Sequence, residues 1–216
     1  MRAQAGAAER ARVARELHDG VIQALFGLDM KLEALRRGGD QTSATIAAEL
    51  AGMQQMVRGE ILELRDLMNA LRPIELDNSR QLPGVLASMV ERFQRDTGIS
   101  ARFVVAGDLP VVLPATALEL VRIAQEALVN VRKHSGAKNV LVRLSGSPQQ
   151  CALVVEDDGC GLEFDGRLTD DELERRHTGP VIIRERARVA GARLAIDSAP
   201  GEGTRVELTV SEAGRA

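Results

Sequence analysis

The stretch RELHDGVIQALFGLDMKLEALRR, residues 15–37, decides the fold of the first part of the chain. Apolar residues in it and just before it recur at steps of three and four, which is one stripe of an α-helix; they are Val13, Leu17, Val21, Leu25, Leu28, Leu32 and Leu35. His18 follows Leu17 and is rotated from it by about 100°, so its imidazole should stand at the rim of the stripe, within reach of reagents. A single helical histidine is usually an exposed bystander, so this stretch alone does not make His18 reactive.

A second amphipathic run follows and repeats its apolar residues as a sustained heptad seam: Ile46, Leu50, Met53, Val57, Ile61, Leu64, Met68 and Leu71. Between the runs, Gly38 and Gly39 can form a left-handed C-terminal cap, and Thr42 or Ser43 can cap the next helix. Pro73 stops that helix. The sequence therefore predicts a helical hairpin with arms of roughly 25 to 30 residues, each about 40 Å long.

Two such helices can bury only one seam against each other, and their apolar stripes are too long to leave the other flank in water. We expect a second copy of the chain to cover that flank, which gives a four-helix bundle across a two-fold axis. The alternative is a hairpin that packs on the following domain of its own chain.

Composition excludes several functions. The 216 residues are 44% hydrophobic and 27% charged, with a net charge of −3, four Phe and neither Trp nor Tyr. Without a basic face or aromatic platforms, a direct nucleic-acid role is disfavoured. Cys151 and Cys160 have no metal-ligand spacing, and their number suits a reducing compartment. There is neither an apolar run of 18 residues nor a signal-peptide pattern, so we expect a cytoplasmic protein, linked to a membrane only through a sensor region upstream of Met1.

After residue 76 the pattern becomes mixed and predicts an α/β sandwich of about 140 residues. Helices are expected over 81–98, 114–135 and 180–191, strands over 99–107, 138–146 and 151–159, and a hairpin over 192–210. The acidic stretch 163–177 has no periodicity and is interpreted as a mobile loop. We therefore expect two domains, a helical one over 1–75 and an α/β one over 76–216.

One helix of this second part carries a polar face. Glu126, Asn130 and His134 are spaced by four, so they share one side of the helix. A carboxylate and an amide oxygen suit a hard cation such as Mg²⁺ that is shared with phosphates, although a solvated polar face gives the same pattern. The glycine-rich turns EDDGCGL (156–162) and PGEGT (200–204) are weak signals of nucleotide binding when each is taken alone.

Four segments in order resemble the core of a sensor histidine kinase, in the subfamily that partners NarL-type response regulators. They are ARELHDGVIQAL (14–25), RIAQEALVNVRKHSGAKNVLVRL (122–144), VVEDDGCGL (154–162) and RERARVAGARLAIDSAPGEGTRVELTV (184–210). The resemblance covers roughly residues 9–210. It implies a homodimer in which residues 1–75 form a helical dimerisation and histidine phosphotransfer domain. Residues 76–216 then form an ATP-binding catalytic domain of the GHKL, or Bergerat, fold.

The resemblance also implies roles for residues of the hairpin. His18 matches the phosphoacceptor, since a neutral imidazole is a good nucleophile near pH 7 and can attack the γ-phosphate of ATP. Asp19 matches the residue that accepts the other ring proton or orients the ring. Gln23 completes the H-D-x-x-x-Q pattern, in which the amide positions a water molecule that dephosphorylates the partner. On this basis His18 is expected to be reactive.

In the ATP-binding domain, the resemblance makes Asn130 the Mg²⁺ ligand and Glu126 its helper. Lys133 and His134 should lie near the phosphates, and Asp157 should accept a hydrogen bond from the adenine amino group. The remaining expected contacts are to the nucleotide or its phosphates; they are Gly159, Gly161, Gly179, Gly201, Gly203 and Thr204.

One segment departs from the family pattern. Members usually have G-L-x-G-M-R-E-R where this chain has GPVIIRER, residues 179–186. Ile182 replaces a glycine that lets phosphate approach the backbone, so its bulk is expected to hold this lid helix off the γ-phosphate or to pack the helix against the sandwich instead. Two alternatives therefore stay open: a partner-binding or phosphatase-only module with a degenerate lid, and another ATPase of the same fold.

Overall fold

The computed structural model describes residues 27–32, 34–35, 43–71, 79–147 and 149–211. The chain divides into two compact units, Met1–Pro73 and Ile74–Ala216. Within the described ranges, no helix has both the length and the apolar character needed to cross a membrane. Each unit is considered by itself below.

The N-terminal unit contains the predicted second arm of the hairpin as helix α2 (Ser43–Leu71), and residues 27–32 and 34–35 are also helical. A Cβ placed on Gly27 would lie 3.8 Å from the sulfur of Met56, so the two helical segments run side by side. Met53 is 4% exposed. On either side of it, four residues of the seam are 39% to 47% exposed: Ile46, Leu50, Val57 and Ile61.

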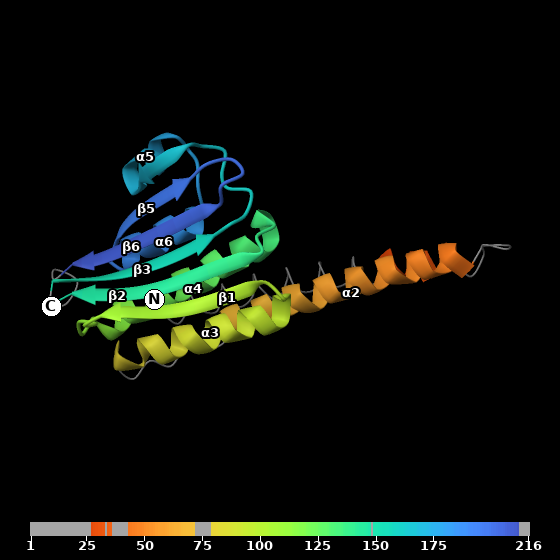
Figure 1. Ribbon diagram of the computed structural model, residues 1–216, viewed down its shortest axis with the longest axis horizontal. Helices are drawn as coiled ribbons and strands as arrows, with labels where there is room; N and C mark the ends of the chain where they lie inside the picture. Colours follow the sequence, from red (N-terminus) through yellow and green to blue (C-terminus); the bar gives the residue numbers. More distant parts are fainter. Residues whose placement is uncertain (1–26, 33, 36–42, 72–78, 148, 212–216) are drawn as a thin grey trace, which may run out of the picture. The chain divides into compact units, whose positions relative to one another are not determined.

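The C-terminal unit is built on a six-stranded sheet of order β1-β2-β3-β6-β5-β4 (Figure 1). The strands are β1 (Ser100–Gly107), β2 (Asn139–Ser147), β3 (Gln150–Asp157), β4 (Gly166–Thr169), β5 (Arg193–Ser198) and β6 (Thr204–Ser211). Strands β1 and β2 are parallel, and every other neighbouring pair is antiparallel. The predicted hairpin around Pro200 is formed by β5 and β6, so that prediction is confirmed.

Helices α3 (Leu82–Thr97), α4 (Pro114–Asn130) and α6 (Val181–Val189) cover one face of this sheet (Figure 1). α4 packs between α3 and α6. Apolar side chains at alternate strand positions face these helices and are buried, as Val142, Leu153 and Leu208 show. The opposite face carries ion pairs such as Arg205 to Glu156 at 2.8 Å, and no described helix of this unit covers it. The predicted α/β sandwich is therefore confirmed, with its core on one side of the sheet.

Two short elements complete the domain and correct one expectation. A 3₁₀ turn, η1 (Ser79–Gln81), leads into α3, and α5 (Asp170–Arg175) lies beside β4 and β5. The stretch 163–177, predicted as a mobile loop, thus contains β4 and α5. Its order comes from a capping box and from Leu173, which is fully buried.

The capping box joins Thr169 to Glu172. The Glu172 carboxylate accepts hydrogen bonds from the Thr169 backbone N–H at 2.8 Å and from its hydroxyl at 2.7 Å. These hydrogen bonds lower the pKa of Glu172. The sequence signal was present, because T-x-x-E is the pattern of such a box. It was missed because the segment is too short to show helical periodicity.

We expect Thr169→Ala to weaken α5 by about 1 kcal/mol, because the box loses its hydroxyl. Amide hydrogen exchange in residues 170–175 should then be about fivefold faster. Thr169→Ser keeps the hydroxyl and should leave the exchange rates close to those of the wild type. Unchanged exchange in the alanine variant would show that Leu173 alone orders this helix.

Candidate functional site

A cavity of about 430 Å³ opens at the end of the C-terminal unit where α4 and β3 end. Its walls are largely apolar, with Ala127 and Val131 on one side, Val155 and Val206 of the sheet on another, and Ile183 of α6 above them. Six of the predicted site residues line it: Asn130, His134, Asp157, Gly161, Gly179 and Thr204. A mainly apolar pocket with a few polar groups is the usual form of a small-molecule site.

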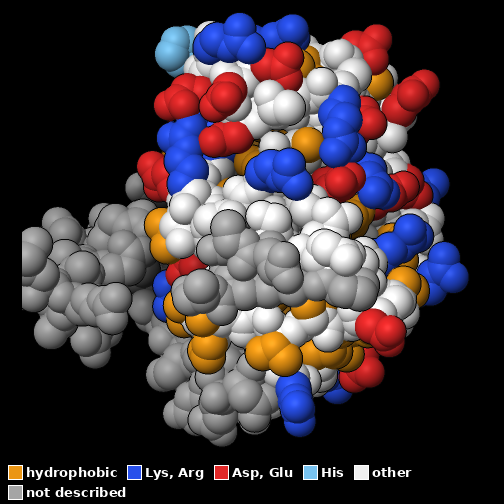
Figure 2. Space-filling view, turned by 90° about the vertical axis from the view of Figure 1, so that its left-hand side faces the viewer, with side chains coloured by type: hydrophobic (Ala, Val, Ile, Leu, Met, Phe, Trp, Pro, Cys, Tyr) orange, Lys and Arg blue, Asp and Glu red, His pale blue; other side chains and the backbone are white. Residues whose placement is uncertain are grey.

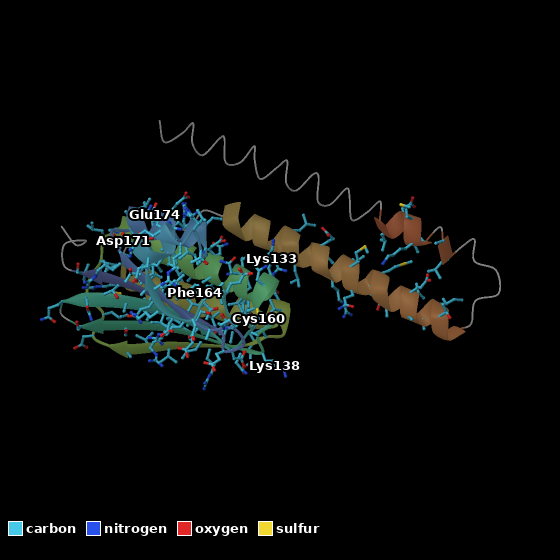
Figure 3. The ribbon with its side chains drawn as sticks, turned by 90° about the horizontal axis from the view of Figure 1, so that it is seen from above. Lys133, Lys138, Cys160, Phe164, Asp171 and Glu174 are labelled. Atoms are coloured by element: carbon cyan, nitrogen blue, oxygen red, sulfur yellow. The ribbon has the colours of Figure 1, made fainter. Side chains whose placement is uncertain are left out.

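The other predicted residues fall into two groups. Five are described but do not line the cavity: Glu126, Lys133, Gly159, Gly201 and Gly203. Glu126 is half-buried one turn before Asn130, and Lys133 is exposed. Figure 3 shows Lys133, Lys138 and Cys160 at this end of the domain, away from Asp171 and Glu174 of α5. His18, Asp19 and Gln23 lie outside the described residues.

The end of α4 brings its polar residues to the cavity through a wider turn. After Asn130 the chain forms a π-helical segment, η2 (Val131–Ser135), which ends at Gly136 in a left-handed conformation. The Ser135 hydroxyl donates to the Val131 carbonyl at 2.8 Å and accepts from the Ala137 N–H at 3.0 Å. π-Turns are often found at functional sites. Here the segment carries His134 and Ser135 into the lining next to Asn130.

The two adjacent aspartates at the end of β3 have different tasks. Asp157 lines the cavity and accepts a hydrogen bond from the Gly159 N–H at 2.9 Å. Asp158 is exposed and accepts from the backbone N–H groups of Lys138 and Asn139, both at 2.8 Å, and from the Asn139 amide at 2.7 Å. It therefore ties the start of β2 to the end of β3. The hydrogen bonds from Asn139 lower the pKa of Asp158.

Asp157 is the titratable group that suits a ligand. Burial raises the pKa of its carboxyl, and this effect outweighs the hydrogen bond from Gly159, which lowers it. Burial disfavours the charged form of an acid, so keeping the Asp157 carboxylate charged costs free energy. A hydrogen bond donated by a ligand would offset that cost. A half-buried carboxylate at the edge of an apolar pocket is a functional-site candidate on these grounds.

The two glycine-rich turns lie against each other. A Cβ on Gly161 would collide with the Ala199 carbonyl, and one on Gly203 would collide with the Asp157 carbonyl. The Gly201 N–H donates to the Cys160 carbonyl at 2.7 Å. Of the predicted glycines in these two turns only Gly161 lines the cavity, so the others shape it through backbone packing.

Sequence reasoning missed Ser198, which joins these turns. Its hydroxyl accepts from the Leu162 N–H at 2.9 Å and donates to the Gly203 carbonyl at 2.7 Å. The signal was available, because Leu194, Ile196 and Ser198 alternate along β5 and share its buried face. A hydroxyl in that position needs partners inside the protein.

The lid segment leads into helix α6. Pro180 caps α6, and its carbonyl accepts from the Arg184 N–H at 3.2 Å. Ile182 is 46% exposed and does not line the cavity, whereas Ile183 is buried and forms part of the wall. That Ile182 holds this helix off the γ-phosphate stays a prediction. Two adjacent helical residues differ by about 100° in direction, so only one of the two faces inward.

α6 is held by ion pairs that the sequence did not predict. The Arg184 guanidinium, nearly buried, lies 3.2 Å from Asp170 and 3.7 Å from Glu174, and Arg188 contacts the same two acids. On its other side, Arg186 pairs with Glu119 of α4 at 3.0 Å. Acidic and basic side chains are interspersed over the upper part of the face seen in Figure 2, where α5 lies. These contacts fix α6 to both α5 and α4.

A matched pair of glycine variants tests the packing of the two turns. Gly201 and Gly203 have φ angles of 85° and 83°, so alanine is strained at both positions by about 1–2 kcal/mol. Only Gly203 also faces a carbonyl, while a Cβ on Gly201 meets nothing within 4 Å. We expect Gly203→Ala to cost about 1–3 kcal/mol more than Gly201→Ala in urea denaturation. Equal losses would mean that the contact with Asp157 relaxes freely.

Comparison with known proteins identifies both parts of the chain. Residues 9–76 match a family described as histidine kinase. Residues 115–214 match the histidine kinase-, DNA gyrase B-, and HSP90-like ATPase family. The histidine kinase domain of the blue-light activated histidine kinase EL346 from Erythrobacter litoralis superposes with a TM-score of 0.47 at 20% identity, over 86% of this chain and 95% of that domain.

Relatives are similar over 93% of the chain. They include an uncharacterized sensor-like histidine kinase of Chloroflexus aurantiacus (33% identity), the nitrate/nitrite sensor protein NarX of Escherichia coli strain K12 (30%) and the sensor protein VraS of Staphylococcus saprophyticus (32%). The chain spans 34%, 32% and 54% of their respective lengths. With a histidine kinase helical segment followed by an ATPase domain of this kind, the chain belongs to the sensor histidine kinases of the NarX, DegS and VraS type.

Proposed function

We propose that the chain is an ATP-dependent kinase core that phosphorylates its own His18 and passes the phosphoryl group to an aspartate of a NarL-type response regulator. The observation that carries the proposal is the apolar cavity of the ATPase domain, where Asp157 and Asn130 lie at the same opening. Because the donor is ATP, we place the reaction in the cytoplasm.

The residues around the cavity suit a nucleotide. The Asp157 carboxylate can accept a hydrogen bond from the adenine amino group, while apolar walls such as Val155 and Ile183 hold the ring. His134 lines the cavity and Lys133 is exposed on the same segment, where each can approach the phosphates.

The residues also fit a magnesium ion shared with the nucleotide. Mg²⁺ usually takes one or two protein oxygen ligands and completes its shell with phosphates and water. Asn130 would supply the amide oxygen, with Glu126 one turn earlier as its helper. Among the residues that the structure describes, no group of three or more His, Cys, Asp or Glu could form a cage for a metal by itself. When bound, the ion would neutralise charge on the transferring phosphoryl group.

The phosphoryl step places few chemical demands on the protein besides position. A neutral His18 imidazole attacks the γ-phosphorus, the bond to the β-phosphate oxygen breaks, and ADP leaves. Asp19 would orient the ring or take its second proton, and Gln23 would position water when the partner is dephosphorylated. The phosphatase-only module and a plain ATPase differ from this scheme in having no phosphohistidine.

Incubation with γ-labelled ATP tests the scheme directly. The wild-type chain should gain label that is stable to alkali and labile to acid, and His18→Gln should lose it while ATP affinity stays within a few-fold. His177→Gln, which changes an exposed histidine after α5, should label normally. Label-free hydrolysis by the wild type would favour the plain ATPase, and stable label on His18→Gln would mean that another residue is the acceptor.

We also propose that the chain is a homodimer through its helical hairpin. The exposed seam of α2 supports this proposal, because an apolar stripe of such length needs a partner in water. Light scattering at micromolar concentration should give twice the mass of one chain. Leu50→Lys with Val57→Lys should give the monomer mass, since both residues belong to the exposed seam.

A control for the dimer test comes from the other unit. Val181 and Val189 of α6 are 58% and 75% exposed, so Val181→Lys with Val189→Lys makes the same chemical change outside the seam. This control should remain dimeric. A monomeric wild type would contradict the four-helix bundle.

A further inference from the structure

Ser198 connects two loops that border the cavity. It ends β5 with a side chain that is 4% exposed. Its oxygen lies 2.9 Å from the Leu162 nitrogen, 2.7 Å from the Gly203 carbonyl oxygen and 3.3 Å from the Thr204 hydroxyl oxygen. Leu162 and Thr204 both line the cavity, whereas Ser198 does not. Any effect of Ser198 on a ligand therefore passes through these neighbours.

Counting protons fixes the direction of each hydrogen bond. A carbonyl oxygen can only accept, so the single hydroxyl proton of Ser198 is committed to Gly203. The Leu162 N–H can only donate, so it occupies one lone pair of the Ser198 oxygen. The hydrogen bond to Thr204 must then be donated by the Thr204 hydroxyl. With its proton turned toward Ser198, the Thr204 oxygen presents only lone pairs to the cavity.

Thr204 lies directly beside Asp157. The two residues are partners across the β3–β6 pair, and both line the cavity. The Asp157 carboxylate is an acceptor. The edge of the cavity formed by these two residues therefore consists of acceptors, and it complements a ligand edge that donates.

We propose that Ser198 is a positioning residue that sets the direction of the Thr204 hydroxyl and so favours a 6-amino purine over a 6-oxo purine. The proposal rests on the proposed function, with adenine nucleotide as the ligand. With the group at C6 facing both acceptors, an adenine amino group can donate one of its two N–H bonds to each, whereas the 6-oxo oxygen of hypoxanthine meets only their lone pairs. Removing the Ser198 oxygen frees the Thr204 proton, which can then turn into the cavity and donate to an oxo group.

The test measures the affinity of the full chain for ADP and for IDP by calorimetry at pH 8. We expect the wild type to prefer ADP, and Ser198→Ala to reduce the ADP-to-IDP affinity ratio by about five- to tenfold, the value of one redirected hydrogen bond. A purely structural role of Ser198 would weaken both nucleotides alike and leave the ratio unchanged.

Three further variants make the result decisive. Ser198→Thr keeps the hydroxyl and should keep the ratio. Thr97→Val removes a hydroxyl from α3 that bonds the Phe93 carbonyl at 2.7 Å and the Ile99 N–H at 3.1 Å, so it should lower stability without changing the ratio. Thr204→Val leaves the bonds of Ser198 to Gly203 and Leu162 in place and should also reduce the ratio, which covers the case in which Ser198→Ala does not fold.

An unchanged ratio in Ser198→Ala, or in Thr204→Val if the former does not fold, overturns the inference and leaves the proposed function standing. A wild-type chain that binds neither nucleotide overturns both. A reduced ratio in these variants, with Ser198→Thr and Thr97→Val unchanged, supports the assignment.

Discussion

The close approach of two backbone turns is the constraint on which the C-terminal unit depends. Gly203 lies against the Asp157 carbonyl and Gly161 against the Ala199 carbonyl, so neither turn can be built without the other. The turns at 156–162 and 200–204, which are far apart in sequence, thereby form one packed unit that borders the cavity. The η2 segment that follows α4 is attached to this unit, because the Cys160 N–H donates to the Ser135 carbonyl at 2.8 Å. The segments that matter for a nucleotide are therefore fixed to one another before any ligand arrives.

Long elements were predictable from the sequence because burial of one face requires apolar residues at many positions along them. The long α2 helix, the apolar β3 strand and the β5–β6 hairpin were expected and are present. Short elements carry less signal. β4 and α5 were missed, because four and six residues show no period and the T-x-x-E pattern was the one local clue.

Within the site, the sequence predicted which residues are involved better than it predicted which way their side chains face. Asp157 and Thr204 were expected beside a ligand and line the cavity, whereas Gly203 acts behind it by packing. The inward side of α6 could not be predicted, since its rotation is decided by Arg184 and Arg186, whose acidic partners lie on other helices. Such long-range pairs have no signature in a single sequence. Ser198 was overlooked because a buried hydroxyl looks like any other serine until its neighbours are known.

Because Arg184 is buried, substitutions in its ion pairs with α5 differ in cost according to which residue is replaced first during evolution. Its guanidinium is held by Asp170 and Glu174, and a buried cation that loses its acids is costlier than two partly exposed acids that lose their cation. Drift that begins at Asp170 or Glu174 therefore passes through a poorly stable intermediate, whereas drift that begins at the arginine does not. The order in which these residues can be exchanged is thus set by which of them lies deepest.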